Sequence, residues 1–83
     1  MSERVPPGEH YTPMSTREDV SIWWNRRERT FDVTTRDWIC DGPGGRLYEA
    51  DVIWTQQRTS RAARQYRWEF LQKRDVRAAL EAQ

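Results

Sequence analysis

The spacing of apolar residues predicts two paired strands in the first half of the chain. Apolar or β-branched side chains recur at every second position, at Val20, Ile22 and Trp24 and, after a polar run, at Phe31, Val33 and Thr35. A period of two sends alternate side chains to opposite faces of a sheet, and β-branched and aromatic residues favour strands. The pattern therefore predicts a β-hairpin with its turn between residues 25 and 29.

A helical interpretation of residues 16 to 29 competes with this hairpin. Ser15 with Glu18 and Thr16 with Asp19 both have the spacing of a helix capping box. In a helix, one face would carry a stripe made of Val20, Trp23, Trp24 and Arg27. The abundance of β-branched and aromatic residues favours the hairpin, and the helix stays an alternative.

A third strand is predicted after the strongest turn signal of the chain, the Asp-Gly-Pro-Gly-Gly run at 41–45. One face of this strand would carry Tyr48, Ala50, Val52 and Trp54, and the other Glu49, Asp51 and Ile53. Trp38, Ile39 and Cys40 end the second strand or belong to the loop after it. The glycine-rich run lacks the lysine and the spacing of a phosphate-binding loop.

Two helices are predicted in the last third of the chain. Thr59 or Ser60 can cap a helix running to about Lys73, and Asp75 can cap a short second helix. The face of the first helix that should lie on the sheet carries Thr59, Ala62, Ala63, Tyr66 and Phe70, and the short helix has an apolar stripe of Val76, Ala79 and Leu80.

These elements predict an α+β fold: a three-stranded antiparallel sheet in β-β-β-α order with one packed helix and a short C-terminal helix. Residues 1–15 are polar and rich in proline, which indicates a flexible N-terminal arm that either stays free or becomes ordered on a partner. Residues 16–83 are predicted to form a single domain.

Composition indicates a folded chain with a polar surface. Charged residues make up 33% of the 83 residues and the mean hydropathy is −1.06, yet five Trp supply large apolar areas for a core. The single cysteine, Cys40, fits a reducing compartment. No stretch is typical of a signal peptide or of a membrane span, so we expect a soluble cytoplasmic protein with no membrane partner.

The residue types needed for catalysis are scarce. The only histidine, His10, lies in the predicted arm and Cys40 lies beside the glycine-rich turn, so nothing marks them as a catalytic pair. No cluster of Cys or His has metal-ligand spacing. The paired carboxylates are typical of a solvated sheet face. We therefore expect a protein that is not an enzyme and has no cofactor, catalytic or metal site.

The outer face of the first predicted helix is a candidate binding site. Trp68 falls opposite the apolar face, with Arg64 one turn before it and Arg61 beside them, so that Arg64 and Trp68 have the spacing of a cation–π pair. Exposed Trp and Arg are enriched at the energetic centres of protein interfaces. The alternative is that Trp68 packs against the last helix or the arm, leaving both arginines as ordinary solvated charges.

The sheet face away from the helix is predicted to carry Trp23 and Ile53 among polar residues. Two large apolar groups on that face must be covered by the arm, by the last helix or by another subunit. Self-association through Trp23 and Ile53, giving a homodimer, is therefore a second interpretation.

Basic residues are concentrated at the end of the chain, where residues 58–83 hold seven Lys or Arg against three acids. Arg58, Arg61, Arg64 and Arg67 recur at three-residue spacing, which spreads them over half the helix circumference. The order of strands, glycine loop and basic helix over residues 20–73 resembles the layout of the arm-type DNA-binding domains of tyrosine recombinases. In that family the sheet enters the major groove, whereas here Asp32, Glu49 and Asp51 on the open face would repel phosphates, and no site residues carry over.

The sequence thus favours a small protein-binding regulator or inhibitor of the kind that phages and other mobile elements encode, with Trp68, Arg64 and Arg61 at the contact. A nucleic-acid-binding protein that uses the basic helix, with Arg58 and Arg67 among its contacts, is the first alternative. A structural or assembly role is the second.

Overall fold

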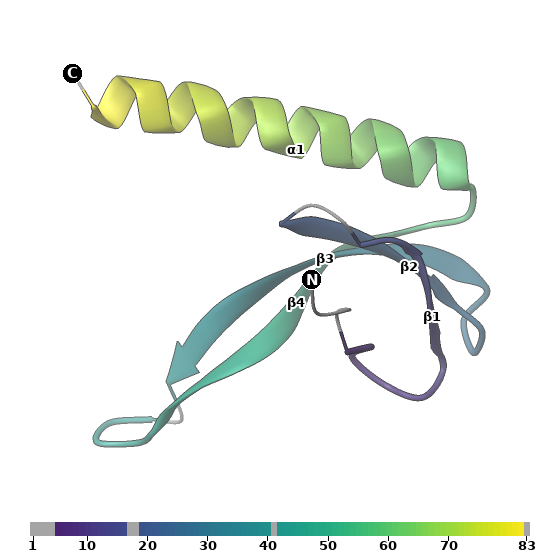
Figure 1. The fold of residues 1–83 in the computed structure, drawn as a ribbon, viewed down its shortest axis with the longest axis horizontal. Helices are drawn as coiled ribbons and strands as arrows, with labels where there is room; N and C mark the ends of the chain where they lie inside the picture. Colours follow the sequence, from purple (N-terminus) through teal and green to yellow (C-terminus); the bar gives the residue numbers. More distant parts are fainter. Residues whose placement is uncertain (1–4, 17–18, 41, 83) are drawn as a thin grey trace.

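The computed structural model describes residues 5–16, 19–40 and 42–82, and it consists of an antiparallel sheet followed by one long helix (Figure 1). The elements are β1 (Tyr11–Ser15), β2 (Val20–Asn25), β3 (Thr30–Cys40), β4 (Leu47–Gln57) and α1 (Ser60–Glu81). Their spatial order is β1-β2-β3-β4, so each strand pairs with its neighbours in the chain. The α+β class and the antiparallel sheet are confirmed, but the sheet has four strands rather than three.

The additional strand is β1, which lies in the segment expected to be an arm. It pairs with β2 through Tyr11↔Asn25 and Pro13↔Trp23, and its register shifts between Pro13 and Ser15. Proline cannot donate a ladder hydrogen bond, so it weakens any strand pattern in a sequence, yet it is tolerated on an edge strand. The edge position of β1 explains both its form and its absence from the prediction.

The hairpin interpretation of residues 20–35 is confirmed. Strands β2 and β3 pair from Val20↔Thr35 to Asn25↔Thr30. The Asn25 side chain holds the turn, because its Oδ1 accepts hydrogen bonds of 3.0 Å from the backbone N–H groups of Arg27 and Glu28. Glu18, one of the residues proposed to cap the competing helix, lies outside the described residues.

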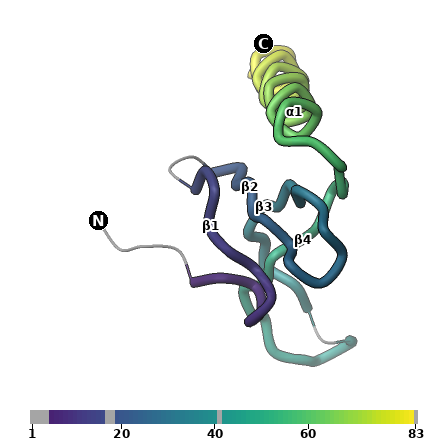
Figure 2. The backbone as a smooth tube through the Cα atoms, turned by 90° about the vertical axis from the view of Figure 1, so that its right-hand side faces the viewer, coloured from purple at the N-terminus to yellow at the C-terminus, as the bar shows by residue number. Residues whose placement is uncertain are grey.

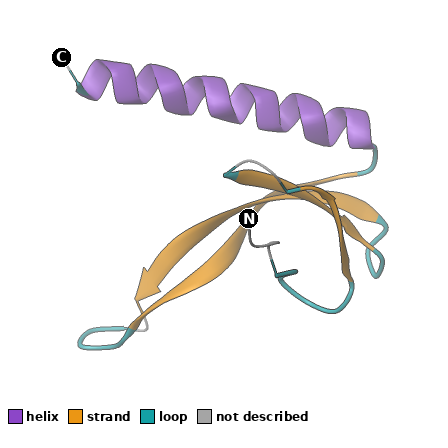
Figure 3. Ribbon diagram, viewed as in Figure 1, coloured by secondary structure: helices purple, strands orange, loops and turns teal. Residues whose placement is uncertain are grey.

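A single helix replaces the two that were predicted (Figure 3). The Thr59 hydroxyl caps it by accepting a 3.1 Å hydrogen bond from the Ala62 N–H. Asp75 lies within the helix instead of starting a second one, because no Gly or Pro interrupts the helix-favouring residues around it. The prediction of a separate C-terminal helix was therefore wrong.

The core lies between α1 and one face of the sheet; in Figure 2 the helix is seen nearly along its axis on that side. Val20, Ile22 and Val33 from the sheet and Ala63 from the helix are fully buried. Met14, Phe31, Tyr66, Phe70 and Leu71 pack around them. The predicted sheet-facing side of the helix is thus confirmed at Ala63, Tyr66 and Phe70.

Two parts of the molecule project beyond this core. The far half of the β3–β4 hairpin extends as a two-stranded ribbon, and the C-terminal half of α1 continues in a different direction (Figure 1). The radius of gyration is 14.3 Å, whereas a compact chain of this length has about 12 Å. The shape therefore exposes surface that a compact domain of this size would bury.

Candidate binding surfaces

The sheet face away from α1 carries a buried polar cluster centred on Asp32. This carboxylate accepts hydrogen bonds from the Tyr11 hydroxyl at 2.7 Å and the Asn25 amide at 3.0 Å. Thr30 and Gln56 donate two more, at 2.6 and 3.1 Å. Asp32 is fully buried, so no substrate reaches it, and we interpret the cluster as a structural network.

Trp23 lies in the same buried layer, which corrects its expected position on an open face. Its indole Nε1 donates a 2.8 Å hydrogen bond to Thr34 Oγ1, and the Tyr11 ring meets it edge-on with ring centroids 6.5 Å apart. Trp23 and Asp32 are both 0% exposed, because β1 brings Tyr11 over this face. Among the covers considered for Trp23, the N-terminal segment is the one found, and Trp23 offers no surface for self-association.

The buried pair of Asp32 and Tyr11 predicts how stability depends on pH. Burial alone would raise the pKa of Asp32, but the four hydrogen bonds it accepts outweigh this and hold its pKa below the usual value. Burial, and then the hydrogen bond to Asp32, raise the pKa of Tyr11. The contribution of Asp32 is present above its unfolded pKa of about 4 and is lost as the pH falls through its folded pKa. The contribution of Tyr11 to stability is present below about pH 10 and is lost as the pH rises through the folded pKa of Tyr11.

We therefore expect the free energy of unfolding, measured by urea titration at several pH values, to fall both below about pH 4 and above about pH 10. Tyr11→Phe removes the ionising hydroxyl, so its alkaline decrease should be smaller than that of the wild type. An equally steep alkaline decrease in Tyr11→Phe would show that the Tyr11 hydroxyl does not cause it.

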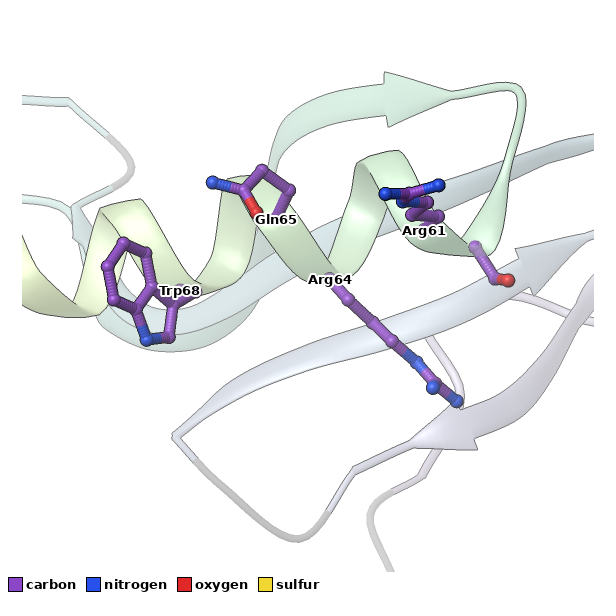
Figure 4. A pocket seen from close by; sticks show the side chains of 5 residues that line it. Arg61, Arg64, Gln65 and Trp68 are labelled. Carbon is purple, nitrogen blue, oxygen red and sulfur yellow. The ribbon is translucent and has the colours of Figure 1, made fainter.

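The outer face of α1 forms an open hollow lined by Ser60, Arg61, Arg64, Gln65 and Trp68 (Figure 4). Trp68 is 56% exposed, and it projects away from the side of the helix that carries Ala63. Among the described residues, neither the N-terminal segment nor the end of the helix covers the Trp68 ring. Trp68 is therefore exposed, as the binding-site interpretation requires. In Figure 4 the Arg64 side chain extends away from the Trp68 ring, so the expected cation–π pair is not formed.

The predicted arginines differ in their contacts. Arg58, Arg61 and Arg64 are exposed, and within the described ranges none of them makes a hydrogen bond or an ion pair. Arg67 is half-buried, and its Nη1 donates a 2.7 Å hydrogen bond to Ser15 Oγ, which ties α1 to β1. Arg67 is therefore bonded inside the fold, and Arg61 and Arg64 are the two predicted arginines that line the hollow beside Trp68.

A second apolar surface lies on the projecting ribbon: it contains the predicted Ile53, together with Trp38 and Leu47, which were not predicted to lie there. Trp38 and Leu47 are each 66% exposed, and Ile53 is 47% exposed. The pairings Thr34↔Ile53, Trp38↔Glu49 and Cys40↔Leu47 place these side chains on the face opposite α1 by strand alternation. Trp38, which was predicted to lie at a strand end or in a loop, is the residue in the sequence that could have indicated this surface.

A third apolar surface lies at the projecting end of α1. Val76 and Leu80, two residues of the predicted apolar stripe, are 60% and 65% exposed. Together with Gln72, Lys73 and Arg77 they line a second hollow. The helix extends beyond the sheet at this point, so no side chain in the described part of the chain covers the stripe.

Neither a metal site nor a membrane helix is found in the described residues. No group of three His, Cys, Asp or Glu side chains there is arranged to hold a metal ion. The His10 ring contacts the Tyr11 ring in a tilted arrangement, with centroids 4.3 Å apart. The exposed Cys40 thiol on the ribbon donates to the Gly42 carbonyl. No helix within residues 5–16, 19–40 and 42–82 is long and apolar enough to cross a membrane.

Comparison with known proteins returns no family model, no curated protein and no solved structure that matches this chain. The functional argument therefore rests on the geometry of the three surfaces.

Proposed function

We propose that this chain is a small, non-enzymatic, cytoplasmic protein-binding regulator or inhibitor of the kind that phages and other mobile elements encode, and that it docks through the outer face of α1. The observation that carries the proposal is the half-exposed Trp68 beside Arg61 and Arg64, which make no hydrogen bond or ion pair among the residues that the structure describes. Trp and Arg dominate the residues whose truncation costs most in protein interfaces, and a large ring on a helix loses little side-chain entropy on binding.

The chemistry of this face indicates the kind of partner. Arg61 and Arg64 supply two forked donors that suit carboxylates, and the first turn of α1 contains no acidic residue. The partner should therefore offer an apolar pocket for Trp68 rimmed by Asp or Glu. Such a contact needs no change in the fold, because the three side chains already lie along one side of a rigid helix.

Nucleic acid is the second candidate, supported by the free Arg58, Arg61 and Arg64. Two features weigh against it. Arg67, which the sequence placed in the basic footprint, is bonded to Ser15, and Arg74 lies 3.5 Å from Asp19. Of the remaining three arginines, Arg58 precedes α1, and Arg61 and Arg64 lie about 60° apart around the helix, so the three do not form one stripe.

Affinity capture from a lysate of the native host, with and without nuclease, separates the two candidates. The proposal predicts that a defined protein is recovered in both conditions and is identified by mass spectrometry. Recovery that depends on intact nucleic acid would overturn the proposal in favour of the second candidate.

Trp68→Ala is expected to weaken binding of the captured protein about 30-fold or more, because truncating a central aromatic contact costs about 2 kcal/mol or more. Isothermal titration calorimetry with the purified partner measures this loss. Thr12→Ala is the control, since Thr12 is an exposed polar residue on β1, outside the outer face of α1. If Trp68→Ala and Thr12→Ala bind equally well, the outer face of α1 is not the docking site.

A further inference from the structure

The chain exposes more surface than a monomer of its mass normally does. Its accessible area is 6710 Å² at 10.0 kDa, where folded monomers expose about 5,200 Å², a surplus of about 1,500 Å². Stable homodimers bury about 1,000–2,500 Å² on each subunit. The surplus is therefore of the size that one subunit contributes to a stable dimer.

Two patches with exposed apolar side chains lie on the projecting parts of the fold. The helix-end patch consists of Gln72, Lys73, Val76, Arg77 and Leu80. The ribbon patch consists of Trp38, Leu47, Glu49 and Ile53, which share one face of the β3–β4 hairpin. Four of the side chains in these patches are large, apolar and at least 60% exposed: Trp38, Leu47, Val76 and Leu80.

The two patches cannot cover one another within a single chain. The ribbon patch continues the sheet face that carries Thr34, whereas α1 packs on the opposite face, against Val33. The helix end and the ribbon also diverge in Figure 1. A contact between the patches therefore requires two molecules.

The patches are complementary in charge as well as in polarity. Lys73 and Arg77 give the helix-end patch two positive charges beside Val76 and Leu80. The ribbon, residues 36–51, holds four acids against two arginines and so has a net charge of −2. In the ribbon patch itself, the exposed Glu49 lies directly across from Trp38 and pairs with Arg36 at 2.7 Å. Arg36 also lies 3.7 Å from Asp51, so these three charged side chains leave a net charge of −1 on this face. Each patch thus offers an apolar centre with a charge opposite to that of the other.

We infer that two copies of this chain form a two-fold dimer in which the helix-end patch of each copy packs on the ribbon patch of the other. A two-fold axis makes this contact twice, so both patches of both chains are covered and the assembly is closed. The contact leaves the outer face of α1 around Trp68 free. The dimer therefore presents two docking faces. The dimer inference does not depend on the proposed function.

Light scattering coupled to size-exclusion chromatography, over a range of protein concentrations, tests the dimer. The wild type is expected at twice the chain mass of 10.0 kDa. Leu80→Asp and Trp38→Asp each place a charge in an apolar contact and should shift the protein to monomer, with a dissociation constant raised at least about 100-fold. Trp68→Ala is the matched control and should stay dimeric. Thermal melts of the separated monomers establish that the two variants are folded, as the exposure of both residues predicts.

A charge exchange tests the pairing of the two patches. Lys73→Glu and Glu49→Lys should each raise the dissociation constant about fivefold, and the double variant should recover most of the loss, as expected for a partly exposed ion pair. A monomeric wild type at all concentrations would overturn the inference, as would a dimer that survives both Leu80→Asp and Trp38→Asp. Additive losses in the double variant would overturn the arrangement of helix end on ribbon.

Discussion

Asp32→Ala is expected to leave the protein largely unfolded at room temperature. The substitution removes the acceptor of four hydrogen bonds and leaves two buried donors, the Tyr11 hydroxyl and the Asn25 amide, short of a partner. Each buried donor that loses its partner costs about 1–3 kcal/mol, so the loss is about 2–6 kcal/mol in total. A chain this small has about that much stability in all.

Thermal unfolding followed by circular dichroism measures this effect. The matched control is Asp37→Ala, which removes an exposed carboxylate from the same strand, where it accepts a hydrogen bond from Thr35. The control should change the free energy of unfolding by less than about 0.5 kcal/mol. Equal melting temperatures for the two variants would show that the Asp32 cluster does not hold β1, β2, β3 and β4 together.

Trp23→Ala is expected to lower the free energy of unfolding by about 3–5 kcal/mol, because it deletes a fully buried indole and leaves a cavity beside Tyr11. It also removes the hydrogen bond to Thr34. Urea titration measures this loss of unfolding free energy. If Trp23→Ala does not fold, the same titration is made on Trp23→Phe.

Ile53→Ala provides the comparison, because Ile53 is 47% exposed on the same face of the sheet. We expect this substitution to cost less than about 1.5 kcal/mol in the isolated chain, since little packing is lost at a half-exposed site. If Trp23→Ala were as mild as Ile53→Ala, the Trp23 side chain would not be packed in the core.

Local patterns predicted most of the fold, because they report on a strand or helix without its neighbours. Alternation identified β2, β3 and β4, and the 3.6-residue period identified the side of α1 that carries Ala63 and Phe70. The polar, proline-containing β1 has no such pattern, since its place in the sheet depends on pairing with β2. The error at Trp23 followed directly, because the cover of that face is supplied by Tyr11 of the missing strand.

In the candidate sites, too, local patterns predicted some features, whereas others depend on contacts between distant parts of the chain. The outward position of Trp68 followed from the helical period alone, and the structure places it in the expected hollow with Arg61 and Arg64. The hydrogen bond from Arg67 to Ser15 joins residues 52 positions apart, so no local sequence pattern could predict it. Likewise, the exposure of Val76 and Leu80 depends on where the sheet ends relative to the helix.

Hydroxyl-radical footprinting of the complex with the captured partner tests docking through the outer face of α1 most directly. In the free protein the exposed Trp54 and Trp68 should both be oxidised, while the buried Trp23 should stay protected as an internal reference. The account predicts that the partner protects Trp68 and leaves the oxidation of Trp54 at its level in the partner-free protein. Unchanged oxidation of Trp68 in a complex that protects another part of the chain would contradict it.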